Sequence, residues 1–262
     1  MKWVGMFSGG LASWMASKRA AEKYGAANGT LLHAETGVED ADTYRYLPQA
    51  AANVGARLVR IADGRTIWQV FKDERFLGNS RVDPCSKILK RQMLDKWVDE
   101  NCDPLDTVIV HGFDWSEGHR FQRMLDYGGK WTREAPLLEP PYLSKPQLIE
   151  MSRAEGIEPP RLYTLGFQHN NCGGGCVKAG QAAFAHLLKT LPDRYQEWES
   201  NEQAMRDYLG KDVSILKDRT GGTKKVLTLK EFRERKQAGI QHNLEDWGAC
   251  GCFQVEAEEG TR

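Results

Sequence analysis

The first half of the chain alternates between short apolar runs and longer stretches in which apolar residues recur at helical spacing. The short runs, which predict buried strands, cover residues 2–7, 30–34, 56–62 and 107–113. The stretches with helical spacing, which predict helices, cover residues 11–24, 42–54 and 83–101. Strands that alternate with helices are typical of a parallel sheet with helices on both faces. The pattern therefore predicts an α/β fold with a doubly wound parallel sheet.

The second half of the chain has a different character. A glycine- and cysteine-rich turn at 170–180 is followed by a long helical stretch at 181–209 and by a basic stretch that ends at Lys236. We therefore divide the chain into an α/β domain at 1–165 and a mainly helical, cysteine-containing extension at 166–262.

Composition restricts the cellular setting and the partners. The 262 residues include 36 basic and 36 acidic side chains, so the net charge of zero gives no general electrostatic case for nucleic acid. Residues 206–236 are an exception, because they contain ten basic and five acidic side chains. If the protein has a nucleic-acid partner, we expect that partner to bind there. No apolar run approaches the roughly 20 residues of a membrane span, and no signal peptide is visible. We expect a cytoplasmic protein that does not enter a membrane.

The turn after the first predicted strand has the features of an anion-binding loop. Its sequence runs from Ser8 through Gly9 and Gly10 to Ser13 and leads directly into a predicted helix. Backbone N–H groups and the helix N-terminus then point at one spot, and the glycines let the backbone approach phosphate oxygens. The loop lacks the Gly-Lys-Ser/Thr ending of a Walker A motif. The alternative is a tight turn that binds no ligand.

Further motifs follow the loop in a consistent order. They are Glu35-Thr36-Gly37, Asp83-Pro84-Cys85-Ser86-Lys87, Gly112 with Glu117 and Arg120, and Leu162-Tyr163-Thr164-Leu165-Gly166-Phe167. With these motifs, residues 1–185 resemble the superfamily of pyrophosphate-loop adenine nucleotide α-hydrolases, and within it the bacteriophage-type family of phosphoadenosine phosphosulfate reductase-like proteins. The superfamily also includes ATP sulfurylase small subunits and enzymes that transfer sulfur to tRNA or DNA.

The resemblance implies ATP or a related adenine nucleotide as the bound cofactor. The residues that it implies for nucleotide binding are Ser8, Gly9, Gly10, Ser13, Glu35, Thr36, Gly37, Lys87, Gly112 and Glu117. Arg120 is expected to act on phosphate or sulfate, because the guanidinium fork matches such anions. Lys90 and Arg91 are expected to be solvated. Ala12 replaces the usual aspartate of the loop, which leaves cleavage of ATP with the help of Mg²⁺ an open question.

Four cysteines in two close pairs suggest a metal site. Cys172 and Cys176 flank three glycines, and Cys250 and Cys252 flank one. Four thiolates can hold a tetrahedral metal or an iron–sulfur cluster. The related proteins commonly have Cys-x-x-Cys at the first pair, and sulfur-handling members often hold a cluster. The resemblance therefore favours [4Fe-4S] first and Zn²⁺ second, and four reduced free thiols remain the alternative.

Cys85 has a different setting, because it lies in the first turn of the helix predicted at 83–101. A helix N-terminus lowers the pKa of a thiol, so Cys85 is predicted to be a sulfur-carrying nucleophile, an additional cluster ligand or a small buried residue. We expect Cys102, at the other end of that helix, to be structural.

Three functions are compatible with these features. In the first, ATP is cleaved between its α and β phosphates to adenylylate an acceptor, and sulfur displaces AMP. In the second, a sulfonucleotide is reduced to sulfite by a cysteine and a thiol reductant. The tail around Cys250 and Cys252 does not match the Glu-Cys-Gly-Ile-His type of the thioredoxin-dependent reductases, which disfavours this second role. The third is a nucleotide- and metal-binding interaction protein, which Ala12 keeps under consideration.

Overall fold

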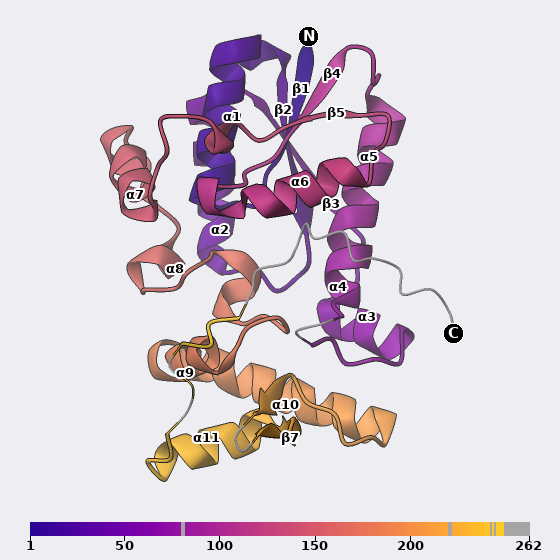
Figure 1. The fold of residues 1–262 in the computed structure, drawn as a ribbon, viewed down its shortest axis with the longest axis vertical. Coiled ribbons are helices and arrows are strands. Elements are labelled where there is room, and N and C mark those ends of the chain that lie inside the picture. Colours follow the sequence, from indigo (N-terminus) through magenta and orange to yellow (C-terminus); the bar gives the residue numbers. More distant parts are fainter. Residues whose placement is uncertain (80–81, 220–221, 242, 244, 249–262) are drawn as a thin grey trace.

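Five parallel strands form the central sheet of the protein, seen in a computed structural model that describes residues 1–79, 82–219, 222–241, 243 and 245–248 (Figure 1). The strands are β1 (Lys2–Met6), β2 (Gly29–Glu35), β3 (Arg57–Ala62), β4 (Thr107–Val110) and β5 (Thr132–Glu134). Their order across the sheet is β3-β2-β1-β4-β5. The predicted α/β fold with a parallel sheet is confirmed, and β5 is a strand that the apolar pattern did not predict.

Alternate residues of the strands face opposite layers of helices. Trp3 and Leu31 belong to the hydrophobic cluster beneath α1 (Leu11–Tyr24) and α2 (Ala41–Val54). Val4 and Leu32 belong to the cluster beneath α5 (Met93–Asn101) on the other face. Because successive side chains of a strand point to opposite faces, one apolar run supplies both clusters. The sheet is thus covered on both sides, as a doubly wound fold requires.

The helix predicted at 83–101 forms as one continuous run with an unexpected middle section. It consists of α4 (Pro84–Ser86), a π-helical segment η2 (Lys87–Gln92) and α5. The Asp83 side chain makes no capping hydrogen bond with the helix. Instead, its Oδ1 lies 3.2 Å from Lys178 Nζ in an ion pair that is buried on both sides. The start of this helix is therefore fixed by a residue 95 positions away in the sequence.

The remaining helices and strands lie around the sheet or form a lower layer of the molecule. They are η1 (Ala26–Asn28), α3 (Ile67–Asp73), η3 (Trp115–Glu117), α6 (Gly118–Asp126), η4 (Pro136–Leu138), α7 (Lys145–Ala154), α8 (Arg161–Thr164), η5 (Asn171–Gly174), α9 (Gln181–Thr190), α10 (Pro192–Leu209), β6 (Leu216–Asp218), β7 (Lys225–Leu227) and α11 (Leu229–Gln237). The helical stretch predicted at 181–209 is thus two helices, because Pro192 opens the second one.

The lower layer lies beyond the carboxyl ends of the strands, with α9, α10, α11 and the β6–β7 hairpin farthest from the sheet (Figure 1). One large hydrophobic cluster joins it to the α/β part, since Phe71 of α3 and Leu162 pack with Phe184 and Trp198. Residues on both sides of the boundary predicted near 165 share this cluster. In the part of the chain that the structure describes, no helix has the length and apolar character needed to cross a bilayer.

Candidate nucleotide-binding site

The candidate site is a cleft at the carboxyl ends of β1 and β4. The chain leaves β1 toward β2 and β3 on one side and returns to β4 on the other, so the direction of winding reverses between β1 and β4. Ligands of open α/β sheets bind at this kind of switch point. The cleft is lined by residues of the phosphate loop, of the segment that follows β4 and of the stretch from Gln168 to Asn171.

The predicted phosphate loop forms one wall of this cleft. Gly9 has a φ of +76°, and Gly10 is the extended residue before α1. Ser13 Oγ donates to the Gly10 carbonyl at 2.9 Å and lies 3.3 Å from Ser8 Oγ. The first turn of α1 contains no acidic residue. The helix N-terminus therefore offers its partial positive charge to an anion without competition from a side chain of its own.

Gly112 brings the end of β4 into contact with the phosphate loop. A Cβ atom at this position would lie 2.7 Å from both the nitrogen and the Cα of Ser13. Real side chains do not approach backbone atoms so closely, so only glycine permits this packing. Gly112 therefore determines how close the two walls of the cleft are.

Arg120 lies on the far wall as a cation held in place by its neighbours. Its guanidinium forms an ion pair with Glu117 and lies 5.3 Å from the centre of the Phe113 ring. Glu117 in turn accepts from the Asp114 backbone N–H at 3.2 Å. Arg120 Nε is buried and has no hydrogen-bond partner within the described parts of the chain. An anionic ligand would satisfy this donor.

His111 lines the same wall but is not an acid at neutral pH. Arg133 lies 3.3 Å from His111 Nε2, and because a guanidinium only donates, Nε2 is the accepting nitrogen. Burial and, secondarily, the Arg133 charge lower the pKa of His111 to about 3. The imidazole is thus neutral, which suits a structural or orienting role.

Two cleft residues were not assigned a role from the sequence. Lys145, the first residue of α7, lines the cleft and donates to the Gln168 carbonyl. The Tyr163 hydroxyl lies so close to the loop that a Cβ on Gly10 would be 3.0 Å from it. Tyr163 was noted only as part of a motif, and Lys145 has no sequence signal beyond its place at a helix start.

The structure does not bring every predicted nucleotide ligand into this cleft. Glu35 forms an ion pair with Arg60 of the neighbouring strand at 2.5 Å. Thr36 is buried and donates from Oγ1 to Glu39 at 2.6 Å. Neither residue lines the cleft, nor does Gly37, and Lys87 is an exposed helix residue. Ser8, Gly10, Ser13, Gly112, Glu117 and Arg120 do line it.

The first cysteine pair lies directly beside the phosphate loop. Asn170 Nδ2 donates to the Gly9 carbonyl at 2.9 Å and so ties the turn at 170–176 to the loop. Cys172 has a φ of +50° and is buried, and Cys176 is half-buried. The Lys178 backbone N–H donates to Cys176 Sγ at 3.4 Å.

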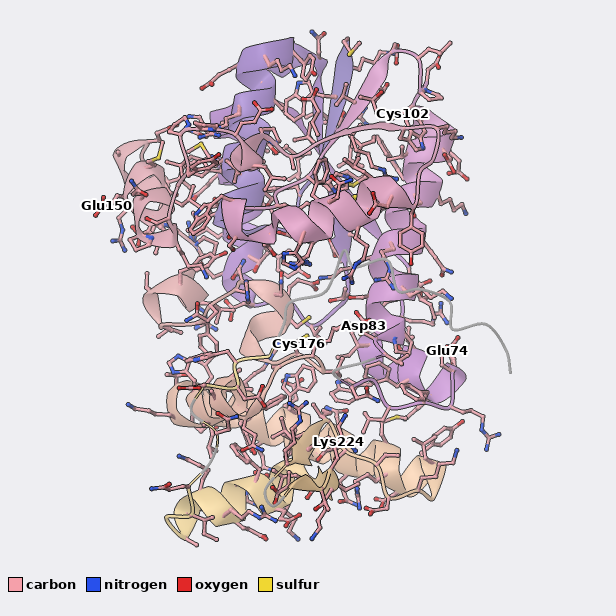
Figure 2. The ribbon with its side chains drawn as sticks, viewed as in Figure 1. Glu74, Asp83, Cys102, Glu150, Cys176 and Lys224 are labelled. Carbon is pink, nitrogen blue, oxygen red and sulfur yellow. The ribbon has the colours of Figure 1, made fainter. Side chains whose placement is uncertain are left out.

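Other cysteines occupy different surroundings. Cys85 is 9% exposed in the same hydrophobic cluster as Cys172 and does not line the cleft. Figure 2 shows Asp83 and Cys176 at the junction between the sheet and the lower helices, with Cys102 at the opposite end of the molecule. Cys250 and Cys252 lie outside the described residues. Within the described residues, no group of three or more His, Cys, Asp or Glu side chains is arranged to hold a metal.

Three of the ten basic side chains in the stretch 206–236 form ion pairs with carboxylates. Ion pairs join Arg206 to Asp212 at 2.9 Å, Arg233 to Glu199 at 2.8 Å and Arg235 to Asp218 at 2.7 Å. The stretch belongs to the lower layer around α11 and the hairpin (Figure 1). Asp212 and Asp218 are already among the five acidic residues of the stretch, so only Glu199 adds a carboxylate from outside it.

Comparisons with known proteins add little to this description. No family model matches the chain, and no curated protein matches it. Among solved structures, it is similar to the NH3-dependent NAD synthetase from Campylobacter jejuni in complex with nitrate ion. The TM-score is 0.39 at 12% identity, with 79% of this chain and 83% of that chain covered. At these values the likeness carries no argument about function, which depends on the site itself.

We predict that Gly112→Ala weakens nucleotide binding by about 10- to 100-fold, because the added methyl group must displace the loop backbone at Ser13 at a cost of roughly 1–3 kcal/mol. Isothermal titration calorimetry with ATP measures the effect. Gly118→Ala is the matched control, since its Cβ would meet only Leu138 Cδ2, at 3.9 Å. Equal affinities of the two variants would contradict this account of the cleft.

Proposed function

We propose that the protein is an adenine-nucleotide-dependent enzyme of the pyrophosphate-loop type that adenylylates an acceptor in preparation for sulfur transfer. One observation carries the proposal. The phosphate loop at the start of α1 and Arg120, whose buried Nε has no partner in the described parts of the chain, line one cleft at the switch point of the sheet. This arrangement supplies fixed positive charge on two sides of a bound polyphosphate.

The reaction would make use of both sides. An acceptor nucleophile attacks the α-phosphorus, the bond from that phosphorus to the bridging oxygen breaks, and pyrophosphate leaves with the bonding electrons. The loop N–H groups after Ser8 would bind the leaving pyrophosphate. Arg120 and Lys145, which line the opposite side of the cleft, would stabilise the charge that develops on the transferred phosphate. Mg²⁺ is a further candidate here, as the usual cation partner of substrate phosphates.

A metal site formed by Cys172, Cys176, Cys250 and Cys252 belongs to the same proposal, with [4Fe-4S] first and Zn²⁺ second. Two observations support it. The Lys178 backbone N–H lies on Cys176 Sγ, as hydrogen bonds to cluster sulfurs do. Ala179 and Gly248 form an antiparallel backbone bridge, so the chain approaches the first cysteine pair two residues before Cys250. A cluster there would handle sulfur beside the nucleotide.

Reduction of a sulfonucleotide is the second candidate, with Cys85 as its nucleophile. The burial of Cys85 in a hydrophobic cluster outside the cleft weighs against it, because a nucleophile must reach the substrate. A nucleic-acid acceptor that contacts 206–236 stays a prediction. Three arginines in that stretch already form ion pairs with carboxylates.

The direct test is to incubate the protein with labelled ATP, with and without total RNA or DNA, and to measure AMP and pyrophosphate. We expect pyrophosphate from the adenylylation step and AMP once sulfur or water displaces the adenylyl group from the acceptor. Turnover should be about 100-fold slower in Arg120→Gln, because a charge that stabilises the transition state is lost. Arg123→Gln is the matched control, since Arg123 is exposed on the same helix and does not line the cleft.

Two other outcomes would refute this reaction. Sulfite release from phosphoadenosine phosphosulfate with a thiol reductant, and no ATP turnover, would establish the reductase. Nucleotide binding without turnover of either compound would establish the binding protein that Ala12 keeps under consideration.

For the cysteine site, we expect Cys172→Ser to lose its metal, because removal of one thiolate breaks the four-ligand set. The measurement is iron and zinc analysis with visible absorbance after anaerobic purification. Cys102→Ser, at the far end of the molecule, is expected to retain the metal content of the wild type. Stoichiometric metal in Cys172→Ser, or none in the wild type, would exclude the site.

A further inference from the structure

A second, much smaller cavity lies on the β2 side of the phosphate loop. It is bounded by Ser8, the end of β2, the helix segment at Lys90, and the cysteine turn. Its volume is about 20 Å³, and one water molecule needs about 10–15 Å³. The cavity can therefore hold a water molecule or a single ion, but not a nucleobase.

His33 presents a hydrogen-bond acceptor to this cavity. The side chain is 2% exposed, and its Nδ1 lies 2.8 Å from the Phe7 carbonyl oxygen. A carbonyl only accepts, so Nδ1 carries the hydrogen and Nε2 carries a lone pair. Burial lowers the pKa of His33, which keeps the ring neutral. Nε2 has no partner in the described parts of the chain.

Asn170 and Glu39 provide two more hydrogen-bond acceptors, and the hydrogen bonds of these side chains identify the accepting atoms. The Asn170 amide nitrogen donates to the Gly9 carbonyl at 2.9 Å and to Thr43 Oγ1 at 3.0 Å, which identifies the other atom as Oδ1. Glu39 Oε1 accepts from the N–H and hydroxyl of Thr36. Asn170 Oδ1 and Glu39 Oε2 are buried and without partners among the residues that the structure describes.

The three buried acceptors without partners belong to residues that line one cavity. An unsatisfied buried polar atom costs about 1–3 kcal/mol, and proteins rarely retain one without a reason. A single water molecule donates two hydrogens and cannot satisfy three acceptors, whereas a cation can. Imidazole nitrogen with carboxylate and amide oxygen is a donor set for first-row divalent metals. The described residues contain no group of three or more His, Cys, Asp or Glu side chains that could hold a metal. The present donor set is of another kind, because one of its three members is an amide.

We propose that this cavity binds a divalent cation of the Mn²⁺ type through His33 Nε2, Glu39 Oε2 and Asn170 Oδ1. The site is defined without the nucleotide, so its existence does not depend on the proposed reaction. Its role does rest on that reaction. Ser8 and Asn170 line both this cavity and the nucleotide cleft, so the cation would place positive charge beside a loop that has lost its usual carboxylate to Ala12.

The positive charge of Lys90 opposes binding of a cation in this cavity. Burial alone would raise the pKa of Glu39, but the Lys90 charge and the Thr36 hydrogen bonds lower it below its usual value. Because Lys90 repels a second cation at the same carboxylate, its removal should strengthen metal binding. The Tyr44 side chain also neighbours Glu39, and its pKa is raised by burial, by the Glu39 and Glu35 charges and by hydrogen bonding with the Glu39 side chain.

The test is titration of Mn²⁺ into chelator-treated protein without nucleotide, with free Mn²⁺ followed by electron paramagnetic resonance. We expect one stoichiometric site, affinity reduced about tenfold or more in Glu39→Gln, and increased affinity in Lys90→Met. Glu35→Gln is the matched control, because Glu35 pairs with Arg60 and does not line the cavity. The site should persist in Cys176→Ser, because Cys176 belongs to the proposed cysteine site but does not line this cavity.

Absence of a stoichiometric site in the wild type would overturn the proposal, as would equal affinities of Glu39→Gln and Glu35→Gln. Lys90→Met keeps all three ligands and tests the proposal even if Glu39→Gln does not fold. Unchanged or weaker affinity in Lys90→Met would also count against it. The readout is metal binding alone, so loss of ATP turnover and loss of the cation site are distinguishable.

Discussion

The hydrogen bond from the Asn170 side-chain amide to the Gly9 carbonyl connects the three candidate sites of the protein. It joins the phosphate loop to a turn 161 positions later in the chain. The same side chain donates to Thr43 at the start of α2, so its orientation is determined. Through this one amide, the nucleotide cleft, the first cysteine pair and the small acceptor-lined cavity share a wall.

The charges and dipoles around this wall give the two cavities preferences for ligands of opposite charge. The cleft has the N-terminus of α1 on one side and Arg120, with an unsatisfied Nε, on the other, which suits a polyphosphate. The smaller cavity has three unsatisfied acceptors, which suit a cation. Opposite preferences on the two sides of a loop are compatible because a bound anion and a bound cation would attract each other across it.

The sequence predicted the parts of the fold that depend on local apolar pattern. Four of the five sheet strands were short apolar runs, and α1 has the bounds that helical spacing predicted. β5 is a three-residue edge strand, Thr-Arg-Glu, which has no apolar signal to detect. The sequence places Asp83 at the start of a predicted helix, but it does not show that this side chain pairs with Lys178, a buried cation from the cysteine turn.

The candidate site was predictable to a similar extent. Glycine-rich turns and the segment around Arg120 are local patterns, and the structure places them in the cleft. The surroundings of Glu35 depend on Arg60 of the neighbouring strand, and those of Lys145 depend on the path of the chain after α7. The unsatisfied atoms of His33 and Glu39 become visible only when every hydrogen-bond partner is known. Long-range pairing of this kind leaves no periodicity in the sequence.

The most direct measurement of the central claim is hydrogen exchange of backbone amides, followed by mass spectrometry, with and without saturating ATP. If the cleft binds the nucleotide, ATP should slow exchange in the peptide that contains Ser8–Ser13 and in the peptide from Gly112 to Arg120. Peptides of the lower layer around α11 should be unaffected. Unchanged exchange in both cleft peptides at saturating ATP would contradict the account.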